Sequence, residues 1–258
     1  MPPLKVTLLG TGTSQGVPVV GCHCNICLSA DKKDQRLRTS ALLESGDTKV
    51  LIDAGPDLRQ QMLQNKVEDL DAILITHEHQ DHTAGLDEVR AVNFQQHHPV
   101  PVYARPAVQQ RLREQFSYIF NRPDYPGLPQ IELRELDEQE FSIGNLKITP
   151  ITLIHKELEV MAFRLGDFTY ITDANHIPPR ARIQLEGTKY LVVNALRKES
   201  HYSHFNLQEA LSLADDLGVQ QAWFTHISHH MGLHAAVNDE LPENRQLAYD
   251  GQVLTFNE

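Results

Sequence analysis

The chain has 258 residues, of which 41% are apolar, and its formal net charge is −11. This composition supports a sizeable core, while the apolar runs are far shorter than the roughly 20 residues of a membrane-spanning helix. The acidic balance disfavours nucleic acid as a partner, because phosphate contacts normally need clustered Lys and Arg. The first residues lack the pattern of a signal peptide, so we expect a cytoplasmic protein without membrane contact.

Predicted strands and helices alternate along the chain. In the first half, strands are expected at 5–9, 40–44, 49–52, 72–75 and 101–103, and helices at 56–65, 86–96 and 105–118. In the second half, strands are expected at 131–135, 146–153, 161–165, 168–172, 190–194 and 221–224, with helices after 178–179 and at 206–218, and a closing hairpin around 250–251. This order predicts an α/β fold, with two mixed sheets face to face and helices outside, in one domain over 1–258.

Two long segments show no periodicity. Residues 17–38 contain all the cysteines and then a charged stretch, and a loop of this length is usually functional or braced. Residues 121–130 hold three prolines and a glycine and are predicted to form a loop or lid.

Four metal-ligating residues follow the apolar strand at 72–75, namely His77, His79, Asp81 and His82. The two histidines of the first pair are two positions apart, so in an extended segment they face the same way. The Asp-His pair comes after the chain turns, which allows a second, neighbouring metal. Imidazole and carboxylate suit Zn, Mn or Fe. The alternative, a polar loop with hydrogen-bonded histidines, accounts poorly for so many ligand types at this spacing.

The H-x-H-x-D-H pattern resembles that of the metallo-β-lactamase-fold hydrolases, and the resemblance covers the whole chain. It implies an αββα sandwich with metals at one end, between the sheets, and further ligands at downstream strand ends. The matching positions are His155, Asp173 and His226, with Asp53 behind the metal loop as a bracing residue. In the implied arrangement one metal takes His77, His79 and His155, the other takes Asp81, His82 and His226, and both share Asp173.

The three cysteines have C-x-C-x-x-C spacing and are Cys22, Cys24 and Cys27. An odd, clustered set is not typical of a disulfide framework and favours a structural zinc, which needs a fourth ligand. We expect His229 in that role, because it lies three residues after His226 and can point away from the catalytic metals. His23 and His230 are competing candidates. Three reduced cysteines without metal are the alternative. A zinc here would brace the loop at about 17–38.

The Gly-rich turn at 10–16, the cysteine spacing and the segment 225–229 are together similar to the PhnP-type phosphoribosyl 1,2-cyclic phosphate phosphodiesterases of the carbon–phosphorus lyase pathway. This resemblance implies two Mn or Zn ions, one structural Zn, and a small cyclic ribosyl phosphate diester attacked by a hydroxide held between the metals. His204 matches a histidine expected to bind the phosphate or protonate the leaving group, and Asp81 is the second residue given a catalytic role. His201 competes with His204. Asn194 stands where the family has Asp, which leaves the polarity near His204 open.

The sequence is also compared with four alternative functions. A tRNA 3′-processing endonuclease would carry a His-Glu-Ala-Thr segment and a basic arm, and this chain has neither. A pyrroloquinoline-quinone biosynthesis protein B-like enzyme shares the cysteine run, and a lactonase or thioesterase shares the fold. A metal-stabilised scaffold without activity would predict an incomplete ligand set. The expected partner is a small phosphodiester substrate, and a homodimer is compatible with the sequence, although no segment marks an interface.

Overall fold

The computed structural model describes residues 2–121, 125 and 127–256. Part of the loop or lid predicted at 121–130 therefore lies outside the described residues. In the part of the chain that the structure describes, no helix has both the length and the apolar character needed to cross a membrane.

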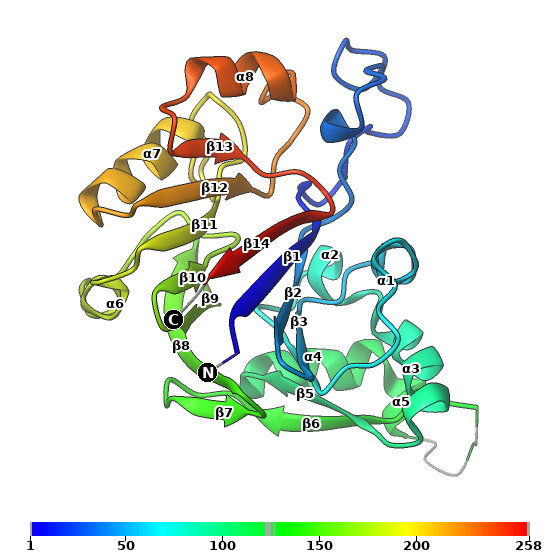
Figure 1. Cartoon of the computed structure of the whole chain (residues 1–258). Coiled ribbons are helices and arrows are strands. Elements are labelled where there is room, and N and C mark those ends of the chain that lie inside the picture. The colour runs from blue at the N-terminus through cyan, green and yellow to red at the C-terminus, as the bar shows by residue number, and fades with distance from the viewer. Residues whose placement is uncertain (1, 122–124, 126, 257–258) are drawn as a thin grey trace.

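Two mixed sheets form the centre of the described structure (Figure 1). The first sheet has the order β14-β1-β2-β3-β4-β5-β6, with bounds Gln252–Phe256, Leu4–Gly10, Ser40–Ser45, Thr48–Ile52, Ala72–Leu74, Val100–Ala104 and Ile131–Glu135. The second has the order β13-β12-β11-β10-β9-β8-β7, with bounds Arg245–Leu247, Gln221–Thr225, Tyr190–Asn194, Phe168–Tyr170, Leu158–Leu165, Leu146–His155 and Phe141–Ile143.

Helices cover the outer faces of both sheets (Figure 1). Those of the first half are α1 (Leu58–Asn65), α3 (Val89–Gln96), α4 (Pro106–Gln115) and α5 (Ser117–Phe120), and a short α2 (Gln80–Thr83) follows β4. Those of the second half are α6 (Pro179–Leu185), α7 (Leu207–Asp216) and α8 (His234–Glu240). One-turn 3-10 helices span Lys32–Asp34 and Leu86–Glu88.

Side chains point alternately to the two faces of each strand, and this explains the four layers of two sheets and two sets of helices. Along β2, Leu43 belongs to the apolar cluster between the sheets, whereas its neighbour Leu42 packs under the first set of helices. Along β11, Val192 faces the opposite sheet and Leu191 faces the second set of helices. Successive side chains of a strand point to opposite faces, so strands that are apolar at every position must be covered on both sides. The predicted αββα sandwich is confirmed.

The predicted closing hairpin around 250–251 is wrong. The strand before this turn, β13, pairs in parallel with β12, whereas the strand after it, β14, pairs antiparallel with β1. The turn therefore connects the two sheets. Asp250-Gly251 correctly indicates a turn, but a turn signal does not determine which strands pair. The three-residue β7 and the helix α8 were not predicted, and α8 begins without a side-chain cap.

Most of the predicted metal ligands lie near the carboxyl ends of parallel strands. Strands β3 to β6 run parallel in the first sheet, and β10 to β13 run parallel in the second. Residues that follow such strands meet at one edge, where α/β proteins generally bind their ligands. At this edge the segment 12–38 projects from the sandwich beside α8 (Figure 1), with the Asp34 carboxylate accepting the His234 backbone N–H at 2.6 Å.

Candidate metal centre

The loop 77–82, which carries the H-x-H-x-D-H pattern, is fixed by close backbone packing. His77 follows β4, and Asp81 and His82 lie on α2. The Ala54 N–H donates to the His82 carbonyl at 2.8 Å, and the Gly85 N–H donates to the Ala54 carbonyl at 2.8 Å. A Cβ on Gly55 would lie 2.1 Å from the Asp81 carbonyl oxygen, so only glycine permits this approach.

Three predicted site residues share an unusual backbone conformation within three residues of the end of a strand. Asp53, Asp173 and His226 have φ values of 60°, 52° and 56°. Non-glycine residues rarely adopt this left-handed region, although Asp and His tolerate it better than most. Such strain is typical of functional sites, where it turns a side chain sharply out of the sheet.

The first predicted ligand cluster contains three imidazoles. His77, His79 and His155 each offer a nitrogen, and these nitrogens all lie within 4.8 Å of one another. The Nδ1 of His155 lies 2.6 Å from the Ser203 carbonyl oxygen, so it carries the proton and leaves Nε2 free to bind a metal. Burial lowers the pKa of His155 to about 4 and that of His77 well below its usual value, so both rings are neutral, as metal ligands must be.

The second cluster combines two carboxylates with two imidazoles, from Asp81, His82, Asp173 and His226, whose ligand atoms also lie within 4.8 Å of one another. His82 Nε2 is 3.0 Å from Asp173 Oδ2 and 3.3 Å from Asp81 Oδ2. His226 Nε2 is 3.1 Å from Asp173 Oδ1. Burial alone would raise the pKa of Asp173, but His226 and His82 outweigh it and hold this pKa well below its usual range.

These buried nitrogens fit a bound cation. His82 Nδ1 lies 2.7 Å from the Asp53 carboxylate and so carries a proton, and although burial lowers the pKa of His82, Asp173 and Asp81 raise it well above its usual value, so the carboxylates favour a positive charge at Nε2, from a proton or from a metal ion. Neither His82 Nε2 nor His226 Nε2 has a hydrogen-bond partner among the described residues. Acceptor atoms that face one another in a buried site repel unless a cation lies between them. The histidines and aspartates together fit a dinuclear metal site, with Asp173 placed to be shared.

Asp53 links both clusters through hydrogen bonds. Its carboxylate accepts the Thr76 hydroxyl at 2.8 Å and the Thr76 N–H at 2.8 Å, in addition to His82. The Thr76 oxygen in turn lies 2.9 Å from His77 Nδ1 and accepts its proton. One buried carboxylate therefore sets the tautomer of one imidazole in each cluster.

His204 contacts the site from the side of the second sheet. Its Nε2 lies 2.9 Å from Asp173 Oδ1, and its ring stacks on His226 with a centroid separation of 4.9 Å. Its Nδ1 is 3.0 Å from Ser203 Oγ and 3.2 Å from His201 Nδ1. His201 is thus one residue further from the predicted ligands. The structure also places His204 with His155 and Asp173 in a group that could hold an ion.

The structure brings the three cysteines together with His229. His229 Nδ1 lies 3.3, 3.5 and 3.4 Å from the sulfurs of Cys22, Cys24 and Cys27. The Cys27 N–H is the main group that lowers the pKa of Cys24, to about 6, while burial raises the pKa of Cys27 to about 11. The buried thiol therefore needs a cation to ionise, which fits a Cys3His zinc site. Neither His23 nor His230 belongs to the group.

The two sites are connected through one short segment. The Ile227 N–H donates to the Thr11 carbonyl at 2.8 Å, and the Thr13 N–H donates to the Ile227 carbonyl at 3.1 Å. Ile227 lies between His226 of the dinuclear cluster and His229 of the cysteine cluster. The segment 12–38 is therefore attached to the metal centre both by backbone pairing and by the predicted zinc.

Asn194 makes contacts that an aspartate could not reproduce. Its Oδ1 accepts the Ala174 N–H at 2.8 Å, and its Nδ2 donates to the Ala174 carbonyl at 2.9 Å. The side chain therefore fixes the peptide that follows Asp173 and makes no hydrogen bond to His204. A carboxylate could accept the first bond but would repel the carbonyl.

The sequence prediction missed the role of the threonines that precede the ligands. Thr76 connects Asp53 with His77, and Thr172 Oγ1 donates to Asp173 Oδ2 at 2.7 Å. The signal was present, because Thr stands directly before a predicted ligand at three strand ends, namely at 76–77, 172–173 and 225–226.

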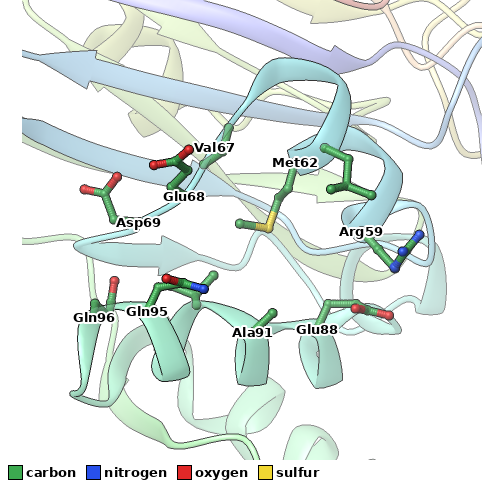
Figure 2. A pocket seen from close by; sticks show the side chains of 11 residues that line it. Arg59, Met62, Val67, Glu68, Asp69, Glu88, Ala91, Gln95 and Gln96 are labelled. Atoms are coloured by element: carbon green, nitrogen blue, oxygen red, sulfur yellow. The ribbon is translucent and has the colours of Figure 1, made fainter.

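A large groove lies away from the predicted ligands. A groove of about 790 Å³ separates α1 from α3, with Met62 and Arg59 facing Ala91 and Glu88 across it (Figure 2). None of the predicted ligands lines this groove. Cavity size therefore does not locate the chemistry here, whereas the buried ligand atoms do.

A four-layered fold with this ligand set at its strand ends defines a metal-dependent hydrolase. The family profile described as beta-lactamase superfamily domain matches residues 48–227. The chain belongs to this superfamily, in its metal-dependent branch with the metallo-β-lactamase fold.

Three known proteins show how the chain is related within it. A crystal structure described as a new diphosphatase from the PhnP family is 37% identical, with a TM-score of 0.92, and the match covers 98% of this chain and 97% of that one. The Zn²⁺-bound PqqB from Methylobacterium extorquens has a TM-score of 0.76 at 20% identity, covers 97% and 99% of the two chains, and shows the fold alone. Octanoyltransferase from Porphyromonas gingivalis is 36% identical over 258 residues, which are 99% of this chain and 52% of that protein. The chain thus spans about half the length of this relative.

Proposed function

We propose that the chain is a dinuclear metal-dependent phosphodiesterase that hydrolyses a small phosphate diester, with a cyclic ribosyl phosphate as the first candidate. One observation carries this proposal: two clusters of metal-ligating atoms meet at Asp173, at the carboxyl ends of both sheets. The relationship to a diphosphatase of the PhnP family supports attack at phosphorus.

The proposed metals are Zn or Mn, because imidazole and carboxylate suit both. His77, His79 and His155 would hold one ion, and Asp81, His82 and His226 the other, with Asp173 between them. Bound there, such ions would supply an activated water as nucleophile and would neutralise the charge of phosphoryl oxygens. Cys22, Cys24, Cys27 and His229 would hold a structural Zn.

The protein's own groups orient the ligands and donate a hydrogen bond to the substrate. Asp53 and the Ser203 carbonyl keep His82 and His155 in the tautomer that leaves Nε2 for the metal. Burial lowers the pKa of His204, so its ring is neutral and its Nε2–H acts as a hydrogen-bond donor directed at the ligand cluster. We assign to this Nε2–H the contact with a phosphoryl oxygen or with the oxygen that leaves.

Two relatives suggest other reactions. The PhnP-family relative is described as a diphosphatase, so a P–O–P bond is the second candidate for cleavage by the same ligand set. The octanoyltransferase name belongs to a protein of which this chain covers 52%, so acyl transfer is not assigned here. A tRNA substrate is disfavoured by the net charge of −11. The cytoplasmic location and the homodimer stay predictions.

A substrate panel tests the proposal on the purified, metal-analysed protein. It contains bis-p-nitrophenyl phosphate, a 2′,3′-cyclic nucleotide, a ribosyl 1,2-cyclic phosphate, a nucleoside diphosphate, a lactone, an octanoyl thioester and a precursor tRNA. We expect cleavage of small phosphodiesters with about two metals per chain in addition to one zinc. Turnover of the lactone or the thioester without any phosphoester cleavage would overturn the proposal.

A further inference from the structure

Residues 18–30 form the tip of the segment 12–38 and carry all three cysteines, and we call them the cysteine tip. Below the tip, the segment is attached to the fold by contacts that do not involve sulfur. The Val17 and Arg36 backbones exchange hydrogen bonds at 2.9 and 2.6 Å, and the buried Arg36 guanidinium donates to the Ala248 carbonyl at 2.5 Å. The base of the segment is therefore held independently of the tip.

The cysteine tip is attached to the rest of the molecule through its sulfur atoms. Its backbone hydrogen bonds, such as that from the Leu28 N–H to the Cys24 carbonyl at 3.0 Å, connect residues of the tip with one another. Among the described residues, the polar contacts from the tip to a residue outside the segment are those of the three sulfurs with His229 Nδ1. Val20 is fully exposed and Leu28 is 66% exposed, so apolar packing adds little. A reaction at the sulfurs would therefore release the tip alone.

Two of the three sulfurs have the arrangement of a redox-active pair. Cys24 and Cys27 have Cys-x-x-Cys spacing, and their sulfurs lie within 4.8 Å of each other. The Cys27 N–H donates to Cys24 Sγ at 3.4 Å, which stabilises a thiolate there. Cys24 is partly exposed and Cys27 is buried, so an oxidant reaches Cys24 first. An accessible thiolate beside a second, protected thiol is typical of cysteines that are oxidised reversibly.

We propose that Cys24 and Cys27 are an oxidative modification site, at which hydrogen peroxide forms a disulfide, zinc is released and the cysteine tip detaches from His229. The proposal rests on the structural zinc proposed above and not on the reaction at the dinuclear centre. The Cys24 thiolate attacks the peroxide, the O–O bond breaks, and the hydroxide that leaves takes up a proton, which gives a sulfenic acid and water. The Cys27 thiolate then attacks that sulfur, the S–S bond forms, and a second hydroxide leaves and is protonated. The two sulfurs together lose two electrons, which the peroxide gains.

The structure limits what this reaction changes. Once the disulfide has formed, Cys22 and His229 remain as ligands, which is half of the set that a structural zinc needs. His229 lies three residues after His226, a predicted ligand of the dinuclear cluster. The Ser228 N–H donates to the Leu196 carbonyl at 2.9 Å, so the backbone between the two sites stays fixed. The dinuclear cluster therefore keeps its ligands while the tip is released.

Metal release on oxidation tests the site in the reduced, zinc-loaded protein. Hydrogen peroxide should release one zinc per chain, measured with a colorimetric chelator, while the metals of the dinuclear cluster stay bound. Peptide mass analysis should find Cys24 and Cys27 in one disulfide, lighter by two hydrogens. Chymotrypsin should then cut after Leu28, because a detached tip is open to proteolysis. Dithiothreitol with added zinc should restore both the zinc content and the resistance to chymotrypsin.

Histidine substitutions supply matched variants, because histidine can replace cysteine as a zinc ligand. Cys22→His keeps the Cys24–Cys27 pair and should release its zinc as the wild type does. Cys24→His and Cys27→His lack the pair and should retain their zinc under the same treatment. Should a histidine variant fail to bind zinc, the disulfide map of the wild type decides.

Three results would overturn the modification site. They are a wild-type protein that keeps all its zinc under peroxide, a wild-type disulfide that includes Cys22, and zinc release with oxygen atoms added to the sulfurs in place of a disulfide. Unligated cysteines in the purified, zinc-supplied protein would instead refute the structural zinc itself. Phosphoester cleavage by the reduced protein is measured separately, so its absence would refute the proposed phosphodiesterase and leave the modification site standing.

Discussion

Asp53 Oδ2 lies 2.7 Å from His82 Nδ1, and both side chains are completely buried. The same carboxylate reaches His77 through the Thr76 hydroxyl, so it orients one imidazole in each ligand cluster. Burial raises the pKa of Asp53, and the imidazole of His82 opposes this effect. Burying a charged carboxylate costs free energy, and its presence here is consistent with a role in holding the ligands in place.

Asp53→Asn tests this orienting role. The amide keeps the shape of the side chain but removes the charge that fixes the proton of His82 on Nδ1. Loss of such a partner typically lowers metal affinity about 10–100-fold, and we expect that loss at both ions. Metal content after dialysis against graded chelator concentrations measures it. Asp167→Asn, the same change directly before β10 and so at the opposite end of that strand from Asp173, is the control. Equal retention of metal in both variants would contradict the role.

The cysteine cluster gives a prediction about its fourth ligand. His229→Ala should remove one zinc per chain and lower the melting temperature, because the segment 12–38 loses its brace. His230→Ala should keep this zinc, although the two rings lie only 4.1 Å apart. His23→Ala should keep it as well. Elemental analysis and thermal unfolding read out all three variants. Zinc loss in His230→Ala or His23→Ala with full zinc in His229→Ala would reverse the assignment.

Several of these groups could be predicted from the sequence because they follow a physical rule. His77, Asp173 and His226 each follow an apolar strand within three residues of its end, and the carboxyl ends of such strands meet at one edge. The grouping of the three cysteines could be predicted from their spacing alone. By contrast, the partner of His155 Nδ1 is the backbone carbonyl of Ser203, and a carbonyl carries no residue-type signal. The pairing of β14 with β1 could not be predicted either, because a turn motif does not identify a strand's partner.

The separation of roles between His204 and His77 can be measured. His204→Ala should lower kcat by about 10²–10³-fold, the usual cost of removing one hydrogen-bond donor to developing charge, with the metals retained. His77→Ala should lower both activity and metal content, because its Nε2 belongs to the first ligand cluster. His201→Ala is the matched control, since His201 contacts His204 rather than Asp173. Equal metal loss in His204→Ala and His77→Ala would show that His204 is itself a ligand.

The buried contact between Arg36 and His234 is predicted to be sensitive to acid. Its Nδ1 lies 3.3 Å from the Arg36 guanidinium and must accept a hydrogen bond, so it is unprotonated, and burial, helped by Arg36, lowers the pKa of His234 from 6.5 to about 4. A depressed histidine pKa means that the unfolded chain binds the proton first. The stability that neutral His234 contributes is therefore present above pH 6.5 and is lost as pH falls toward 4.

His234→Gln keeps an acceptor for Arg36 but cannot titrate. The unfolding free energy of wild type minus that of the variant should therefore fall by about 2 kcal/mol over this window, allowing for partial solvent screening. Burial raises the pKa of the nearby Asp250 to about 6, which acts in the opposite sense, but Asp250 is present in both proteins and cancels in the difference. Urea unfolding at several pH values measures this difference, and a difference that stays constant with pH would show that His234 titrates normally.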